Sequence, residues 1–217
     1  HRDLHSFPTR RSSDLSENPF LSPTYITGGY PPHEMQNPFF LARKYKAEDI
    51  RELMLPDGLE LIELPGHNFH MVGVRTDDDV VFLADSIFSM HMLRKYHINF
   101  MFDVPAFSRT LDEIGKMQAA LFIPAHAEPQ TDIRPLAVAN KEKIDEIAKN
   151  IINFCEHPIT YDELIRKLFD EYGRRLDMQQ YYLVGFTIRS YLSWLKSKGS
   201  IQTLFEDNML CWRSWHA

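Results

Sequence analysis

The sequence predicts an α/β chain of the layered α+β type, in which a mixed sheet is followed by a helical end. Between residues 58 and 124, runs rich in Val, Ile, Leu and Phe occur in the order strand, hairpin, helix, helix, strand. After residue 132 the spacing of apolar residues becomes helical, and strand character returns only from residue 201. With 217 residues, of which 44% are hydrophobic and 25% charged, the chain has ordinary globular composition and can bury a core.

The first fifteen residues are expected to be foreign to the protein. Residues 1–15 (HRDLHSFPTRRSSDL) back-translate without a break into DNA that resembles the adapter of short-read sequencing libraries. The kinase-like triplet at the start of this segment and the basic pair inside it therefore carry no selected chemistry. We expect the natural chain to begin near Ser16, inside a longer gene.

Region 16–132 is predicted to form the first domain, with helices packed outside a mixed sheet. It opens with a Pro- and Gly-rich stretch, 17–37, that is typical of a long irregular loop. Three aspartates at 77–79 separate two strand-like runs, which favours a hairpin turn over a calcium site. The expected elements are strands Gly58–Leu64, His70–Thr76, Val80–Ala84 and Ala120–Pro124, and helices Ile87–Tyr96 and Pro105–Gln118.

Region 133–217 is predicted to form a second, helical domain that resembles a winged helix. Thr160 is followed three residues later by Glu163, which is the pattern of a capping box at the start of a helix. Gly199 is expected to end the last helix. The expected elements are helices Ile133–Glu156, Thr160–Tyr172 and Gln179–Lys198, and a hairpin of strands Ile201–Phe205 and Met209–Trp215.

Net charge and cysteine content limit the partners and the location. A net charge of −6 at pH 7 argues against nonspecific binding to nucleic acid or to an acidic membrane. The sequence has no apolar run long enough to span a bilayer and no visible secretion signal, so we expect a cytoplasmic protein. Cys155 and Cys211 lack the spacing of a zinc knuckle or redox pair and are expected to be free buried thiols.

Three segments place metal-binding residue types at the ends of predicted strands. They are PGHNFH around His67, FLADS around Asp85 and IPAHAEP around His126. A charged or polar group at the end of an apolar run is costly to bury unless something pairs with it or binds it. A single histidine after a strand is more often structural, but three such positions in one small domain favour a metal site.

At these residues the chain resembles the metallo-beta-lactamase superfamily of hydrolases, whose fold glyoxalase II shares. In that family a PGH segment, a strand that ends in Gly-Asp or Ala-Asp, and a later histidine after Pro or Gly contribute to a dinuclear metal site. The resemblance covers residues 16–129 and implies the second half of a metallo-beta-lactamase αββα sandwich. It implies that His67 binds one metal, that the catalytic Asp85 bridges both, and that His126 binds the other. His70 is not assigned as a ligand, because Met71 stands where many members have a second histidine.

The first metal motif of the family, His-x-His-x-Asp-His, does not occur in the sequence. We therefore expect the chain to be a fragment without the N-terminal half of the site and to be inactive alone. For the intact protein the resemblance implies two zinc ions, although iron or manganese would suit the same ligands. It also implies hydrolysis, in which a metal-activated hydroxide attacks an ester, thioester, lactam or phosphoester.

Other polar residues near the trio have more ordinary interpretations. His91 and His97 are expected to have surface or packing roles. Glu128 would either orient His126 through a hydrogen bond or lie exposed in a turn. The serines that follow Asp85 lack a Gly-x-Ser-x-Gly elbow, which argues against a serine hydrolase.

A rival hypothesis makes the chain a binding module whose winged helix holds nucleic acid or protein. The second domain contains many Lys and Arg residues, but acidic residues offset them, whereas a recognition helix should carry its cations on one face. Helix Gln179–Lys198 is instead dominated by apolar residues, which predicts packing against the first domain or against a second copy in a homodimer. The hydrolase hypothesis, with a small-molecule substrate and no membrane partner, therefore ranks first.

Overall fold

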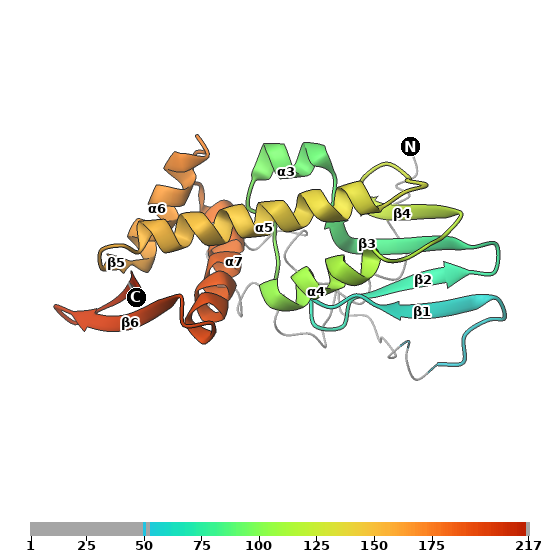
Figure 1. The fold of residues 1–217 in the computed structure, drawn as a ribbon, viewed down its shortest axis with the longest axis horizontal. Helices are drawn as coiled ribbons and strands as arrows, with labels where there is room; N and C mark the ends of the chain where they lie inside the picture. The colour runs from blue at the N-terminus through green and yellow to red at the C-terminus, as the bar shows by residue number, and fades with distance from the viewer. Residues whose placement is uncertain (1–49, 51–52, 216–217) are drawn as a thin grey trace.

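A four-stranded mixed sheet forms one end of the molecule in the computed structural model, which describes residue 50 and residues 53–215 (Figure 1). The segment 1–15 and the loop 17–37 lie outside these residues. The strands lie in the order β1 (Leu59–Glu63), β2 (Val72–Thr76), β3 (Val80–Phe88), β4 (Leu121–His126). The pairs β1–β2 and β2–β3 are antiparallel and β3–β4 is parallel, so the prediction of a mixed sheet is confirmed.

Strand β3 is longer than its sequence pattern predicts. The prediction ended the strand at Ala84 and began a helix at Ile87, but the strand continues to Phe88. Ile87 is 0% exposed and Phe88 is 3% exposed, so both belong to the buried end of the strand. Helix α3 (Met90–Tyr96) begins only after Ser89, whose side chain accepts a hydrogen bond from the backbone N–H of Met92.

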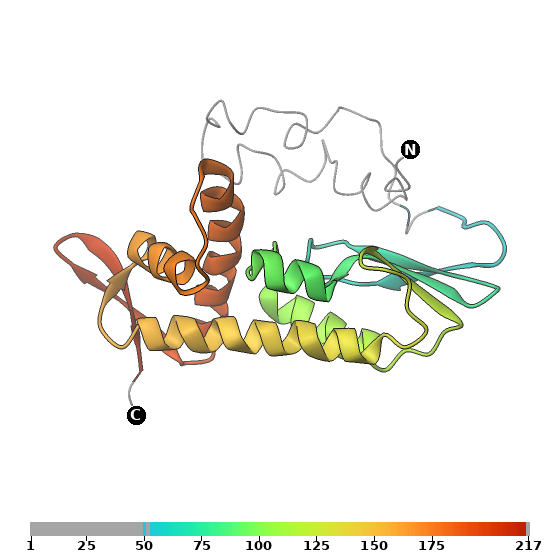
Figure 2. The same ribbon diagram turned by 90° about the horizontal axis from the view of Figure 1, so that it is seen from above.

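Two further helices, α4 (Val104–Ile114) and α5 (Arg134–Phe154), lie on one face of the sheet (Figure 2). Asp103 caps α4 through the backbone N–H of Ala106, and a proline occupies the first turn, as predicted. The apolar face of α4 packs on β3. The loop before α4 therefore lies near the carboxyl end of β3.

The helical end contains α6 (Tyr161–Glu171) and α7 (Met178–Ser197), with the hairpin of β6 (Ile201–Glu206) and β7 (Met209–Ser214). The predicted capping box is confirmed, because the Thr160 and Glu163 side chains each accept from the other residue's backbone N–H. A short strand, β5 (Ile159–Thr160), was not predicted, and it pairs with β7 to complete a three-stranded sheet in the order β5-β7-β6.

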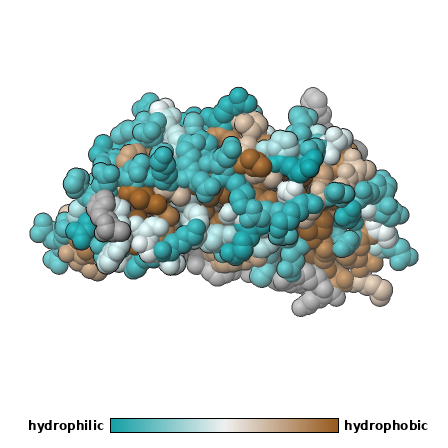
Figure 3. Space-filling view, viewed as in Figure 1, coloured by the Kyte–Doolittle hydropathy of each residue, from teal (hydrophilic) through white to brown (hydrophobic). Residues whose placement is uncertain are grey.

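A cluster of buried apolar side chains extends continuously from Leu64 beside the sheet to Ile201 in the helical end. Helix α5 runs along the length of the molecule and contributes to the cluster at both ends (Figures 1 and 2). Cys155 and Cys211 are buried free thiols, as predicted. The face in Figure 3 is mostly hydrophilic, with small apolar patches. Within the described part of the chain, no helix has the length and apolar character required to cross a bilayer.

Candidate metal centre

His67 lies in a tight loop between β1 and β2. The conformation of this loop requires glycine at the preceding position, Gly66. Gly66 has φ +131°, and a Cβ added there would lie 2.3 Å from the backbone of Phe107 in α4. The loop is also tied down by Thr110, whose hydroxyl donates to the carbonyl of Pro65 at 2.6 Å. The close approach of loop and helix therefore fixes the backbone from which His67 projects.

Asp85 projects from an irregular part of β3. Ala84 has φ +51°, an uncommon conformation for a residue with a Cβ, and the pairing of β3 with β4 shifts register on both sides of it. Ser86 is fully buried, and its hydroxyl donates to the carbonyl of Leu83 at 2.5 Å across the irregularity. Such bulges bend a strand and redirect its side chains, which explains how a carboxylate can leave an otherwise apolar strand here.

His126 is the last residue of β4 and pairs with Phe88 in the parallel ladder. Its carbonyl accepts a hydrogen bond from the backbone N–H of Ser89 at 3.2 Å. Because β3 and β4 are parallel, their carboxyl ends meet at one edge of the sheet, beside the β1–β2 loop.

The three sequence-predicted residues converge at this edge. His67 Nε2 lies 3.6 Å from Asp85 Oδ2, and His126 Nε2 lies 3.1 Å from Asp85 Oδ1. Each histidine thus faces a different oxygen of the same carboxylate. The side chains of His67 and Asp85 are 16% and 20% exposed, whereas that of His126 is 42% exposed, so the centre opens toward solvent on the His126 side.

The tautomer of His67 follows from its hydrogen bond. Its Nδ1 lies 3.1 Å from the carbonyl oxygen of Phe100, and because a carbonyl only accepts, Nδ1 carries the proton. Burial lowers the pKa of His67, against the opposing effect of Asp85, so the neutral ring is favoured and its Nε2 lone pair points toward the carboxylate. Two acceptors that face each other suit a cation between them.

The donor set fits part of a metal centre. Imidazole nitrogens and a carboxylate are ligands that zinc and related transition metals accept, and a backbone carbonyl on the second ring nitrogen is the usual way to orient such a histidine. Among residues 50 and 53–215, however, no three His, Cys, Asp or Glu side chains form a complete metal-binding group. The geometry is that of two histidine–aspartate pairs that share Asp85.

An apolar ring forms one wall of the centre. Phe88 lies 6.2 Å from the ring of His67 and 6.5 Å from the ring of His126, and it stacks on Phe107 behind it at 5.5 Å. Because Phe88 is only 3% exposed, it limits water on that side and strengthens electrostatic interactions between the three polar groups.

The other polar residues considered from the sequence have different surroundings. His70 and His91 are exposed, and Glu128 is an exposed residue whose carbonyl accepts from the Gln130 side chain. His97 stacks on Tyr172 at 4.4 Å, in agreement with a packing role. The sequence carries no signal for the contact of the Phe100 carbonyl with His67, since every residue type has a backbone acceptor.

Comparisons with known proteins identify the fold. The chain is similar to a metallo-beta-lactamase family protein from Thermus thermophilus, with 16% identity and a TM-score of 0.63 over 88% of this chain and 62% of the other. It is also similar to a beta-lactamase domain protein from Burkholderia ambifaria, with 15% identity and a TM-score of 0.63 over 78% of this chain and 53% of the other. No protein-family model and no curated protein matches the sequence.

These similarities show that the chain has a fold of the metallo-beta-lactamase kind, as the residue pattern predicted. At 15–16% identity they establish the fold alone, and the chain spans 53–62% of the length of the two structures.

Proposed function

We propose that the chain is part of a metal-dependent hydrolase and that His67, Asp85 and His126 are metal ligands. The observation that carries the proposal is the placement of two imidazole Nε2 atoms on the two oxygens of one carboxylate, at 3.6 Å and 3.1 Å. The metallo-beta-lactamase kind of fold supports the same conclusion.

Each residue has a distinct part in this proposal. His67 is held in the tautomer that presents the Nε2 lone pair, because Nδ1 donates to Phe100. Asp85 directs one oxygen to each histidine, so a single negative charge serves two cation positions. His126 occupies the open side, where a substrate would approach, and Phe88 restricts water behind the centre.

A divalent metal, with zinc as the best match to these ligands, would acidify a water molecule and polarise a carbonyl or phosphoryl oxygen. Asp85 would supply the shared carboxylate of such a centre, and His126 would border its open side. The substrate class that suits this chemistry is a small ester, thioester, lactam or phosphoester.

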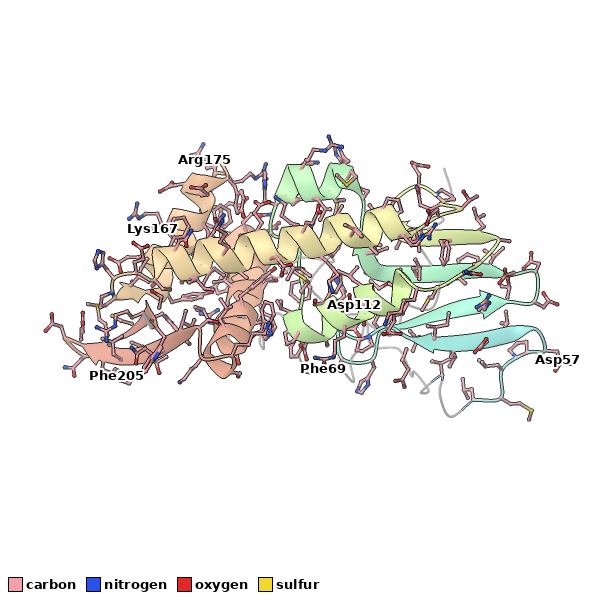
Figure 4. All side chains as sticks on the ribbon, viewed as in Figure 1. Asp57, Phe69, Asp112, Lys167, Arg175 and Phe205 are labelled. Carbon is pink, nitrogen blue, oxygen red and sulfur yellow. The ribbon has the colours of Figure 1, made fainter. Side chains whose placement is uncertain are left out.

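The side chains of the helical end favour this function over nucleic-acid binding. Several of its cations have partners within the chain: Arg189 lies 4.0 Å from the ring of Tyr161, and Arg166 pairs with Asp170 at 3.3 Å. Lys167 projects from α6 in Figure 4 and lies 5.6 Å from the ring of Phe154. We propose that this winged-helix-like end supports the hydrolase fold.

The test is metal binding by the purified apoprotein, measured with Zn²⁺ by calorimetry and with Co²⁺ by absorption. We expect the wild type to bind and the variants His67→Gln, Asp85→Asn and His126→Gln to bind at least about tenfold more weakly, because each loses a ligand. His70→Gln is the matched control, since it removes a neighbouring exposed histidine, and should bind as the wild type does.

Two results would refute the proposal. One is a wild type that binds neither ion, and the other is equal binding by the three ligand variants and the His70→Gln control.

A further inference from the structure

The orientation of His67 depends on a single peptide group. The carbonyl of Phe100 accepts from His67 Nδ1 at 3.1 Å, and the ring of Phe100 meets the imidazole edge-on at 5.3 Å. This carbonyl lies between α3 and α4, in a stretch without helix or strand hydrogen bonds to hold it in place. Something else must therefore set its direction.

Thr187 in α7 holds the other end of the same peptide group. Its Oγ1 accepts from the backbone N–H of Met101 at 3.0 Å and lies 3.5 Å from the carbonyl of Asn99, to which it can donate. The carbonyl of Phe100 and the N–H of Met101 belong to one planar trans peptide, in which the two bonds point in opposite directions. A hydroxyl that holds the N–H on one side therefore aims the carbonyl at His67 on the other side.

The burial of Thr187 requires a hydrogen-bond partner for its hydroxyl. Thr187 is 0% exposed in the middle of a helix, where burial of a hydroxyl is unfavourable unless it is hydrogen-bonded and where valine would fill the same volume. Its hydroxyl accepts from Met101, which lies 86 residues earlier in the segment that faces the centre. On the far side of this stretch, the backbone N–H groups of Phe102 and Asp103 both donate to the carbonyl of Gly66, one residue before His67.

We propose that Thr187 is a positioning residue for His67: through the Phe100–Met101 peptide it fixes the ring orientation and the tautomer that presents Nε2 to a metal. The inference deepens the proposed function and rests on it for the role of Nε2. The Thr187 hydroxyl, the Phe100–Met101 peptide and the His67 imidazole form a series of hydrogen bonds in which each bond polarises the next. It makes the helical end part of the site, although none of its residues is a ligand.

The decisive variant is Thr187→Val, which keeps the shape and removes the hydroxyl, compared with Thr187→Ser, which keeps the hydroxyl. The first readout is the ¹⁵N NMR spectrum of the His67 ring in the metal-free protein at pH 8, which distinguishes protonation at Nδ1 from protonation at Nε2. We expect Nδ1–H in the wild type and Thr187→Ser, and a mixture or Nε2–H in Thr187→Val. The second readout is Co²⁺ affinity, which should fall about tenfold in Thr187→Val and recover in Thr187→Ser.

Ser190→Ala is the matched control, because Ser190 lies three residues further along α7 and accepts from the N–H of Val104 at 3.0 Å. Val104 is not part of the peptide that faces His67, so this variant should lose some stability and keep the wild-type tautomer. If Thr187→Val fails to fold, Thr187→Ala provides the same comparison without a branched side chain.

The proposal is overturned if the variants without the hydroxyl keep the Nδ1–H tautomer, or if Ser190→Ala changes the tautomer equally. The NMR readout needs no metal, which separates the two proposals. A tautomer that shifts in a protein without metal affinity would refute the proposed function and support the positioning role. An unchanged tautomer in Thr187→Val, in a protein that binds metal, would support the proposed function and refute the positioning role.

Discussion

The sheet edge that carries the histidine–aspartate trio and the helical end of the chain are built by different means. At the sheet edge the backbone adopts unusual conformations, with φ +131° at Gly66 and φ +51° at Ala84. In the helical end, α6 and α7 are regular helices with side-chain caps at Thr160 and Asp177. At the sheet edge these conformations lie beside the side chains that converge, whereas in the helical end positive φ occurs in turns outside α6 and α7.

The sheet edge also depends on the helices. A strained backbone persists only when its surroundings over-determine it. Helix α5 supplies Asn140 to the end of β3, and helix α7 supplies Thr187 to the peptide beside His67. The regular helices thus hold the irregular edge in place.

The largest effect is expected for Gly66→Ala, which places a side chain in the close contact between the sheet edge and α4. The new Cβ would overlap the backbone of Phe107 at 2.3 Å, in a backbone conformation that side chains rarely adopt. The free energy of unfolding should fall by about 3–5 kcal/mol, or the protein should fail to fold. Urea denaturation measures the change.

Gly173→Ala is the control for that substitution. Gly173 also has positive φ, +58°, but nothing lies within 4 Å of an added Cβ, so only the backbone preference is lost, about 1–2 kcal/mol. Equal losses at the two glycines would show that close packing at the sheet edge is not what distinguishes it.

Asn140→Ala tests the link from α5 to the sheet edge. The Asn140 amide accepts from the N–H of Phe88 at 3.0 Å and donates to its carbonyl at 2.8 Å, and the residue is 2% exposed. Its loss leaves both groups of Phe88 without this partner, so we expect about 2–3 kcal/mol of destabilisation and weaker Co²⁺ binding.

The same substitution elsewhere in α5 separates the two effects. Asn150 donates to the hydroxyl of Tyr172 at 3.1 Å, in the helical end. Asn150→Ala should cost about 1 kcal/mol in chemical denaturation and leave Co²⁺ affinity unchanged. An equal drop in metal affinity for both variants would contradict the division between the regions.

Thr160→Ala removes the capping box from the regular region. The Thr160 hydroxyl accepts from the N–H of Glu163 at the start of α6, and its loss should lower the free energy of unfolding by about 1 kcal/mol. Thr160→Ser keeps the cap and should restore stability. Thermal and urea unfolding measure both, while a change in metal affinity for Thr160→Ala would show that α6 also acts on the site.

The smallest effect is a pH dependence at His97, between α3 and the helical end. Burial lowers the pKa of His97, and Lys143 and Arg174 act in the same direction against Glu146. As pH falls below the ordinary histidine pKa, the unfolded chain binds a proton that the folded chain does not, so stability is lost until the lowered pKa is passed.

His97→Phe keeps a ring to stack on Tyr172 and removes this titration. The loss of unfolding free energy between pH 7.5 and pH 5.5 should therefore be smaller in the variant than in the wild type. Because both proteins contain the other histidines, the difference between their dependences of unfolding free energy on pH reports His97 alone. A variant slope equal to the wild-type slope would exclude His97 as a source of acid sensitivity.

Much of the fold could be predicted from the sequence because its signals are local. The turn at 77–79, the cap at Thr160 and the long amphipathic helix α5 each depend on residues within a few positions of one another. Strand β5 could not be predicted, because two residues carry no periodicity and the strand exists only through its pairing with β7. The end of β3 was taken for helix because a fully buried strand and a buried helix both appear as continuous apolar runs.

By itself the sequence determined which side chains are available, and their order and spacing, with the family resemblance they carry, selected His67, Asp85 and His126 as candidates for one site. Only the tertiary structure decided how those groups are aimed: the positive φ of Ala84, the direction of the Phe100 carbonyl and the hydroxyl of Thr187 that holds it. The physical reason is that residue chemistry and periodicity are local properties, whereas the direction of a peptide group depends on contacts with residues as much as 86 positions away.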